Sequence, residues 1–256
     1  MLLNFQYHPA TEPNQNIPIV LIHGLFGSLS NLGILARALN DQYDIVQIDV
    51  RNHGLSAHTN EMNYAVMAQD VMETLDYLNI EQFSAIGHSM GGKLAMKLTE
   101  VAPSRLQQLV ILDMAPFAYQ ENHHDQIFKA LFAVKSANIE SRKQATEIMA
   151  QYLQENMVIQ FLLKSFNKGQ WLFNVDALYQ HYADILSWDN LQVWSKSTLF
   201  IRGENSPYVA QPDKLEAIHQ QFSNVEIQIV ENAGHWLHAE QPEQVITLIK
   251  AYLHSI

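Results

Sequence analysis

The sequence contains no cysteine among its 256 residues and few basic side chains. Without cysteine, disulfide bonds, thiolate nucleophiles and cysteine-ligated zinc sites are excluded. The 15 Lys and Arg residues face 26 Asp and Glu residues, which gives a formal net charge of −11. A dedicated nucleic-acid binder needs a basic face to neutralise phosphates, so we expect no nucleic-acid partner.

Long hydrophobic runs are also missing. No segment approaches the roughly 18–20 uninterrupted apolar residues of a membrane span. The first residues, MLLNFQYHPATEPNQN, lack the basic region and the apolar core of a signal peptide. We therefore expect a soluble cytoplasmic protein without a membrane partner. Apolar residues make up 48% of the chain and aromatic residues 10%, which is a globular balance.

Short apolar runs alternate with longer amphipathic segments over much of the chain. The runs are rich in Ile and Val, as in strands buried on both faces, and cover residues 17–23, 43–50, 83–87, 106–112, 198–201 and 225–230. Helices are predicted between them, at residues 32–39, 64–78, 91–101, 212–222 and 242–253. This order predicts an α/β fold with a mainly parallel sheet and helices on both faces.

The alternation stops between residues 115 and 190. Apolar residues recur there at helical spacing, as in Ile127, Phe128, Leu131 and Phe132, and no convincing buried strand is present. We interpret residues 115–190 as a helical cap inserted into a single structural domain, whose core comprises residues 1–114 and 191–256.

The stretch FSAIGHSMGG, residues 83–92, contains a G-x-S-x-G pattern between a predicted strand and a predicted helix. The pattern is common by chance, but these flanks are those of a nucleophile elbow. Such a turn lifts the Ser89 hydroxyl above the sheet edge, at the positive end of a helix dipole. The sequence therefore favours Ser89 as a nucleophile over an ordinary serine in a glycine-rich turn, with His88 as a supporting residue.

The loop HGLFGS, residues 23–28, follows an earlier predicted strand. Acyl transfer needs donors aimed at the developing oxyanion, and backbone N–H groups can supply them. We expect one donor from Met90, after the nucleophile, and one from Leu25, with Phe26 as the alternative. Gly24 is expected to support this loop, and His23 is interpreted as a structural histidine that braces it.

The stretch ENAGHW, residues 231–236, follows the last predicted strand. Serine needs a base to take its proton, and histidine has a suitable pKa. His238 is a competing candidate for this base. We favour His235, because Gly234 sets it at the strand end and it follows Ser89 in chain order.

Several of these motifs together resemble the α/β-hydrolase superfamily, and within it the small bacterial serine esterases. The resemblance covers essentially the whole chain and rests on HGLFGS, DVRNHGLS, GHSMGGK, NSPYV and AGHWLHAEQP. It implies an α/β-hydrolase fold, hydrolysis of small carboxylic esters or thioesters through an acyl-enzyme, and no cofactor. It also implies acyl-CoA thioesters as substrates. An acidic chain would then need a local basic patch for the anionic carrier, for which Lys164 and Lys168 are candidates.

The acid that orients the histidine is the open question in this sequence. Its usual place in the superfamily is the loop after the penultimate strand, where Ser206 stands. Asp113 ends the strand after the nucleophile strand, at the edge of the sheet where catalytic groups collect. We favour Asp113 over Glu204, although Asp113 could instead cap backbone amides. A missing acid is the least favoured option, because loss of a triad aspartate costs about 10⁴ in rate. The resemblance also supports Asp113, and Ser206 is then its hydrogen-bonding partner.

Other functions are compatible with a nucleophile elbow. Carbon–carbon bond hydrolases, peptidases and acyltransferases share it, and a non-catalytic ligand-binding protein could keep the fold. His123, His124 and Asp125 are interpreted as solvated cap surface, because no further metal ligands recur at suitable spacing. Some aromatic residues are expected to line an acyl pocket. The candidates are Phe117, Phe128, Phe132, Phe161, Trp171, Tyr208 and Trp236.

Overall fold

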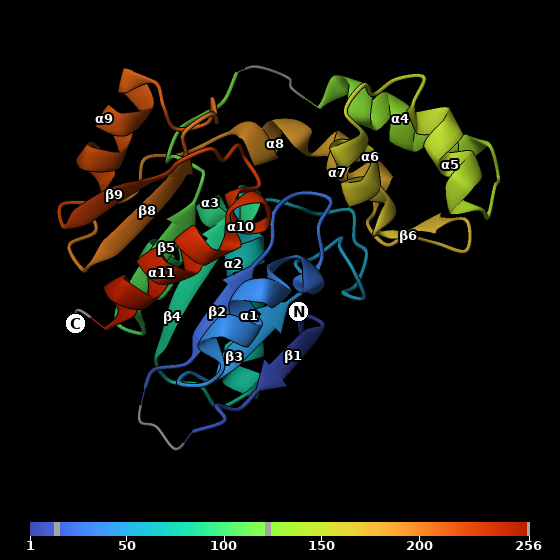
Figure 1. The fold of residues 1–256 in the computed structure, drawn as a ribbon. Helices are drawn as coiled ribbons and strands as arrows, with labels where there is room; N and C mark the ends of the chain where they lie inside the picture. Colours follow the sequence, from blue (N-terminus) through green and yellow to red (C-terminus); the bar gives the residue numbers. More distant parts are fainter. Residues whose placement is uncertain (13–15, 121–123, 255–256) are drawn as a thin grey trace.

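The structure is a computed structural model that describes residues 1–12, 16–120 and 124–254. A seven-stranded sheet with the order β1-β3-β2-β4-β5-β8-β9 forms its centre (Figure 1). The strands are β1 (Phe5–His8), β2 (Ile19–Ile22), β3 (Ile45–Ile48), β4 (Phe83–His88), β5 (Leu106–Leu112), β8 (Thr198–Gly203) and β9 (Val225–Val230). The pairs from β3 to β9 are parallel, which confirms the predicted fold class.

The edge strand β1 was not predicted from the sequence. It pairs antiparallel with β3, and its pattern of half-buried and exposed residues differs from the buried strands. A short strand that alternates FQYH lacks the continuous Ile and Val run by which the other strands were recognised.

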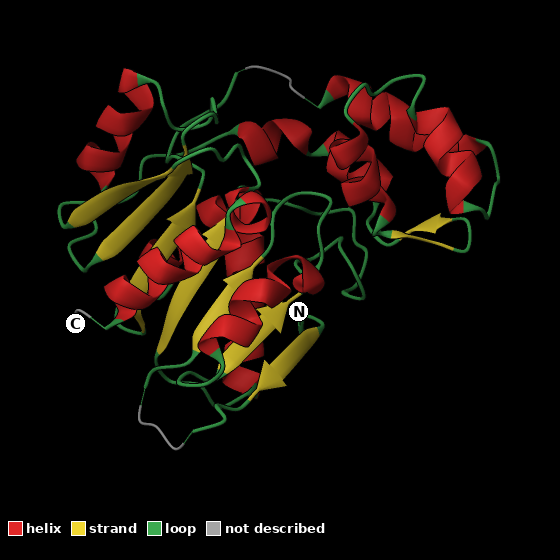
Figure 2. Ribbon diagram, viewed as in Figure 1, coloured by secondary structure: helices red, strands yellow, loops and turns green. Residues whose placement is uncertain are grey.

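Helices cover both faces of the sheet (Figure 2). One face carries α2 (Tyr64–Tyr77), α3 (Met90–Val101) and α9 (Pro212–Gln221), and the other α1 (Gly33–Leu39) and α11 (Pro242–Leu253). Because side chains alternate along a strand, β2 supplies both cores: Val20 and Ile22 enter one, and Ile19 and Leu21 the other. The buried Ile and Val runs therefore follow from a sheet that is covered on both sides.

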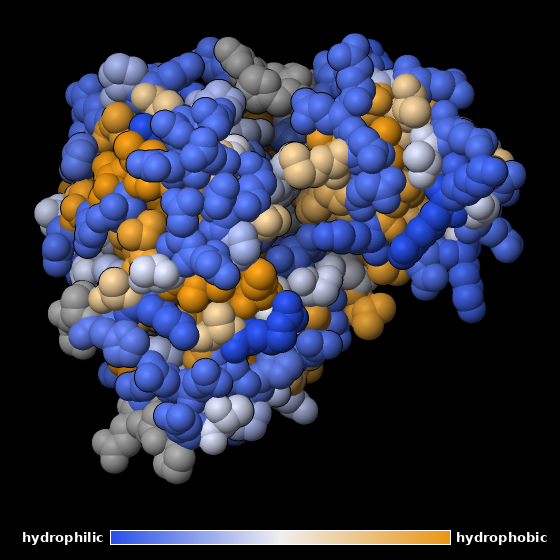
Figure 3. Space-filling model, viewed as in Figure 1, coloured by the Kyte–Doolittle hydropathy of each residue, from blue (hydrophilic) through white to orange (hydrophobic). Residues whose placement is uncertain are grey.

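We call residues 115–190 the cap segment. It contains α4 (Asp125–Ser136), α5 (Arg142–Met149), α6 (Asn156–Leu163), α7 (Val175–Gln180) and α8 (Tyr182–Leu186). It also contains an unexpected hairpin of β6 (Phe166–Asn167) and β7 (Gln170–Trp171), in which Phe166 and Trp171 are buried. The face shown in Figure 3 is mostly hydrophilic, with hydrophobic residues exposed at the upper right, where Figure 1 places the cap segment, and at the left and centre of the view. Within the described ranges, no helix is both long and apolar enough to cross a membrane.

Candidate active site

Ser89 occupies a tight turn between β4 and α3. Its backbone has φ 55° and ψ −122°, a conformation that costs a non-glycine residue about 1–3 kcal/mol. The turn closes because its neighbours have no side chains: a Cβ on Gly87 would lie 2.2 Å from the Gly91 carbonyl oxygen. A Cβ on Gly91 would lie 2.3 Å from the Ile22 carbonyl oxygen. The sequence motif thus produces the strand–turn–helix geometry of a nucleophile elbow.

A continuous hydrogen-bond chain links Ser89, His235 and Asp113. The His235 Nε2 lies 3.0 Å from the Ser89 Oγ, and its Nδ1 lies 2.6 Å from the Asp113 Oδ2. The Asp113 side chain is fully buried, whereas the His235 side chain is 18% exposed. With Nδ1–H donating to the carboxylate, Nε2 is left to accept the Ser89 proton.

The loop after β8 holds the Asp113 carboxylate. The Ser206 hydroxyl donates to Oδ2, and the Gly203 N–H donates to Oδ1 at 3.0 Å. The Asp113 backbone is bent to φ 52°, and its N–H donates to the Ile201 carbonyl at 2.8 Å. Glu204 lies elsewhere: its exposed carboxylate accepts the Asn232 N–H at 2.9 Å. Of the acids considered from the sequence, the structure brings Asp113 to the histidine.

Neutral aromatic groups surround the His235 ring. Tyr208 stacks on it with the ring centroids 4.1 Å apart, and the His88 Nε2–H donates to the His235 carbonyl at 2.8 Å. The His238 ring lies 4.5 Å from that of His88 and makes no hydrogen bond to Ser89 among the described contacts. Burial lowers the pKa of His88 well below its usual value. Burial also lowers the pKa of His238 to about 3. The rings of His88 and His238 are therefore uncharged at neutral pH.

The loop of residues 23–28 is braced by two buried histidines. The His23 Nδ1–H donates to the Gly24 carbonyl at 2.8 Å, and its Nε2 accepts the Val50 N–H at 3.1 Å. The His53 Nε2 accepts the Phe26 N–H at 3.2 Å, and burial lowers the pKa of His53 to about 3. This bond occupies the N–H of Phe26, the alternative oxyanion donor, and leaves Leu25 as the candidate from this loop.

Leu25 and Met90 both lie beside Ser89: Leu25 lines the same two cavities as Ser89, and Met90 is the next residue in the chain. Met90 is the first residue of α3, so its N–H has no acceptor within the helix. A Cβ on Gly24 would lie 3.1 Å from the Ser89 Cβ, so a glycine allows the loop to approach the elbow closely. The next residue but one, Phe26, has φ 62°, a further strained backbone at the site.

Two cavities meet at Ser89, and they share Leu25, Ser89 and His124 in their linings. The first has a volume of about 50 Å³ and is lined by His235, Trp236 and Phe161, together with Gly24, Phe26 and His88. The second has a volume of about 30 Å³ and is lined by Tyr64, Lys93, Met114 and Tyr208. Three of the aromatic candidates, Phe161, Trp236 and Tyr208, therefore reach the site.

The other four aromatic candidates are not among the residues that line either cavity. Phe128 packs against Phe26, Phe132 against Tyr179, Trp171 against Phe173 and Phe117 against Tyr119. Helical spacing identifies an apolar face, but both a core and a cavity can receive such a face. The expectation that these four aromatic residues line an acyl pocket is therefore wrong.

His124 also departs from the sequence expectation. It is half-buried, lines both cavities, and its Nδ1 is hydrogen-bonded to the Tyr182 hydroxyl, so it is not solvated cap surface. Its partner lies 58 residues further along the chain, so no local pattern could have indicated this position. His123 lies outside the described residues. Among those that the structure describes, no group of three or more His, Asp or Glu side chains could hold a metal.

Comparisons with known proteins agree with this geometry. Residues 17–137 match the profile of a family described as alpha/beta hydrolase fold. Esterase YbfF of Escherichia coli K12 is 47% identical, and the match covers 100% of both chains. A putative esterase/lipase of Haemophilus influenzae is 43% identical over 99% of this chain and 89% of its own. Among solved structures, a marine microorganism esterase has a TM-score of 0.91 at 30% identity, over 98% of this chain and 99% of the other.

Proposed function

This chain belongs to the α/β-hydrolase family and is a carboxylic ester hydrolase of that family, and we propose that it cleaves small carboxylic esters through an acyl-enzyme on Ser89. The observation that carries the proposal is the unbroken hydrogen-bond chain from the Ser89 Oγ through His235 to Asp113. A serine hydroxyl becomes an effective nucleophile only when a base takes its proton.

The first half of the reaction forms the acyl-enzyme. The Ser89 Oγ attacks the ester carbonyl while the His235 Nε2 takes its proton, and Asp113 holds the imidazole and stabilises the imidazolium. The N–H groups of Leu25 and Met90 stabilise the oxyanion of the tetrahedral intermediate. Collapse of the intermediate breaks the bond to the leaving oxygen, which receives the proton from His235.

The second half releases the acid. His235 deprotonates a water molecule, which attacks the acyl-serine, and the second tetrahedral intermediate collapses with return of the proton to Ser89. The neutral states of His88 and His238 suit this cycle, because positively charged neighbours would oppose the imidazolium that forms on His235.

Covalent labelling tests the proposal most directly. A fluorophosphonate should modify the protein with one label per chain, and mass spectrometry of the digest should locate the label on the peptide that contains Ser89. Ser89→Ala should remain unlabelled and inactive on p-nitrophenyl acetate, and Ser206→Ala should still be labelled. A folded wild-type protein that takes up no label would instead favour the non-catalytic binder.

Acyl thioesters are a second candidate substrate class, and one observation favours them. Lys164 is exposed, and its charge adds to burial and to His235 in lowering the pKa of His238, which lines the first cavity. A cation there would attract the phosphates of an acyl-CoA leaving group. Lys164→Gln should raise KM for acetyl-CoA several-fold and leave KM for p-nitrophenyl acetate unchanged, with Lys168→Gln measured alongside. An equal effect on both substrates would count against thioesters.

A further inference from the structure

The two cavities at Ser89 differ in their relation to His235. His235 and its neighbour Trp236 line the first cavity, and neither lines the second. In the proposed reaction His235 must deliver a proton to the leaving oxygen, which therefore lies within hydrogen-bond reach of Nε2. The leaving group then extends into the first cavity, and the acyl group is directed into the second.

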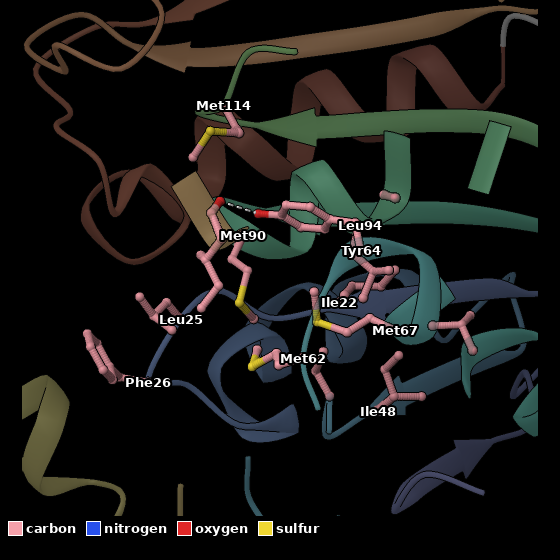
Figure 4. Close-up of a cluster of buried hydrophobic side chains, with 14 of the residues drawn as sticks. Ile22, Leu25, Phe26, Ile48, Met62, Tyr64, Met67, Met90, Leu94 and Met114 are labelled. Atoms are coloured by element: carbon pink, nitrogen blue, oxygen red, sulfur yellow. Dashed lines mark hydrogen bonds between the residues drawn. The ribbon is translucent and has the colours of Figure 1, made fainter. Parts of the chain in front are cut away.

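Tyr64 of α2 lines the second cavity. Tyr64 is 8% exposed, and its hydroxyl donates to the Ile185 carbonyl at 2.8 Å. This bond, drawn as a dashed line in Figure 4, ties the ring to the end of α8 in the cap segment. The Tyr64 ring also packs edge-on against Trp188, with the centroids 6.2 Å apart.

A second contact fixes the same wall. Lys93, one turn after Ser89 on α3, donates through Nζ to the Leu186 carbonyl at 2.8 Å and to the Ser187 carbonyl at 2.9 Å. Burial lowers the pKa of Lys93 to about 7, and its protonated form matches the negative end of α8. Tyr64 and Lys93 therefore join the core to the cap segment beside this cavity, and a wider cavity there would require these hydrogen bonds to break.

The volume of this cavity restricts what it can hold. One water needs about 10–15 Å³ of such space, so about 30 Å³ corresponds to roughly two or three water-sized groups. We propose that Tyr64 is a specificity-determining residue that limits the acyl group to short chains, from acetyl to butanoyl, so that the larger part of the substrate is its leaving group. This inference rests on the proposed function, because only an acyl-enzyme on Ser89 gives the two cavities these roles.

The surroundings of Tyr64 indicate what would follow if its ring were removed. Met62, Met67 and Met90 belong to the same buried cluster, as Figure 4 shows. Methionine side chains are unbranched and adapt readily to a new neighbour. Truncation of Tyr64 should therefore extend the cavity toward these flexible side chains, and the extension should accept additional methylene groups of an acyl chain.

The experiment compares kcat/KM for p-nitrophenyl acetate, butanoate, hexanoate and octanoate, which share one leaving group. Wild type should prefer acetate and butanoate over octanoate by at least about tenfold. Tyr64→Ala should move the optimum to hexanoate or octanoate. Tyr64→Phe keeps the ring but removes its bond to Ile185, so its chain-length profile should shift much less than that of Tyr64→Ala. The matched control Val158→Ala alters the first cavity and should scale all four esters by one common factor.

A second variant tests the same inference if Tyr64→Ala does not fold. Met114 lines the second cavity, and Met114→Phe should fill it and lower activity on butanoate relative to acetate by about tenfold. A wild-type preference for octanoate, or an unchanged chain-length profile in Met114→Phe, would overturn the inference and leave the proposed function standing. Absence of hydrolysis for every ester by folded wild type would overturn both.

Discussion

The neighbouring strands β5 and β8 end at the same edge of the sheet but contribute different chemistry to it. The end of β5 supplies a carboxylate, Asp113, whereas the loop after β8 supplies neutral donors, the Gly203 N–H and the Ser206 hydroxyl. All three groups converge on one point beside His235. The Ser206 hydroxyl thus bonds the same Asp113 oxygen that contacts His235, so the ends of both strands lead to this point.

Removal of the charge at the end of β5 should have the largest effect. Asp113→Asn should lower kcat by about 10⁴, because the amide cannot hold the required tautomer or stabilise the imidazolium. Steady-state kinetics on p-nitrophenyl acetate, with thermal unfolding to verify the fold, would measure this. A variant that retained more than about a tenth of wild-type activity would show that another acid serves His235.

Exchange of the carboxylate at position 113 and the hydroxyl at position 206 should recover part of the activity that is lost without Asp113. Asp113→Ser alone should be about as inactive as Asp113→Asn, and the double variant Asp113→Ser/Ser206→Asp should exceed it by about tenfold or more. The reason is that the Ser206 Oγ already bonds the carboxylate oxygen that contacts His235, so an acid at position 206 can reach the same point. A double variant no better than the single one would show that only β5 presents the carboxylate correctly.

The hydroxyl on the β8 side should matter more for stability than for turnover. Ser206→Ala removes one hydrogen bond to a buried carboxylate, which should lower the free energy of unfolding by about 1.5–3 kcal/mol. Asp113 keeps its bonds to Gly203 and His235, so kcat/KM should fall by less than about tenfold. Urea unfolding and kinetics on the same preparation would separate the two effects, and a loss of activity as large as that of Asp113→Asn would contradict them.

Glu204 should give the smallest effect. Its carboxylate is exposed and accepts a hydrogen bond from the Asn232 N–H, away from His235. Glu204→Gln keeps an acceptor in place, so kcat/KM should stay within about twofold of wild type and stability within about 0.5 kcal/mol. A larger loss of activity at unchanged stability would mean that this carboxylate acts on the histidine after all.

Sequence patterns located most of the core, because each signal there is local. A run such as IPIVLIH predicts a buried strand, and FSAIGHSMGG contains both the elbow and the elements on either side. Asp113 was identified in the same way, as an acid that follows directly on a buried strand. The elements β1 and β6–β7 were missed, since their residues lack a long apolar run.

The cavities could not be derived in this way. Tyr64, Lys93 and His124 line the cavities and are held there by hydrogen bonds to residues far away in the chain, such as Ile185. No local spacing in the sequence indicates such contacts. The same limit explains why Phe128 and Trp171 do not line the two cavities: Phe128 packs against Phe26, and Trp171 packs against Phe173. Periodicity gives the apolar face of an element, and tertiary packing decides whether that face meets solid core or open space.

The positive φ angles of Phe26, Ser89 and Asp113 have an evolutionary consequence. Each costs about 1–3 kcal/mol in a non-glycine residue, which is substantial against a total stability of about 5–15 kcal/mol. At Ser89, whose side chain belongs to neither core cluster, glycine should raise heat tolerance and abolish ester turnover. At Phe26 and Asp113 the loss of a buried side chain outweighs the relief of strain. Selection for thermal stability alone would therefore remove the hydrolytic activity while the fold is retained.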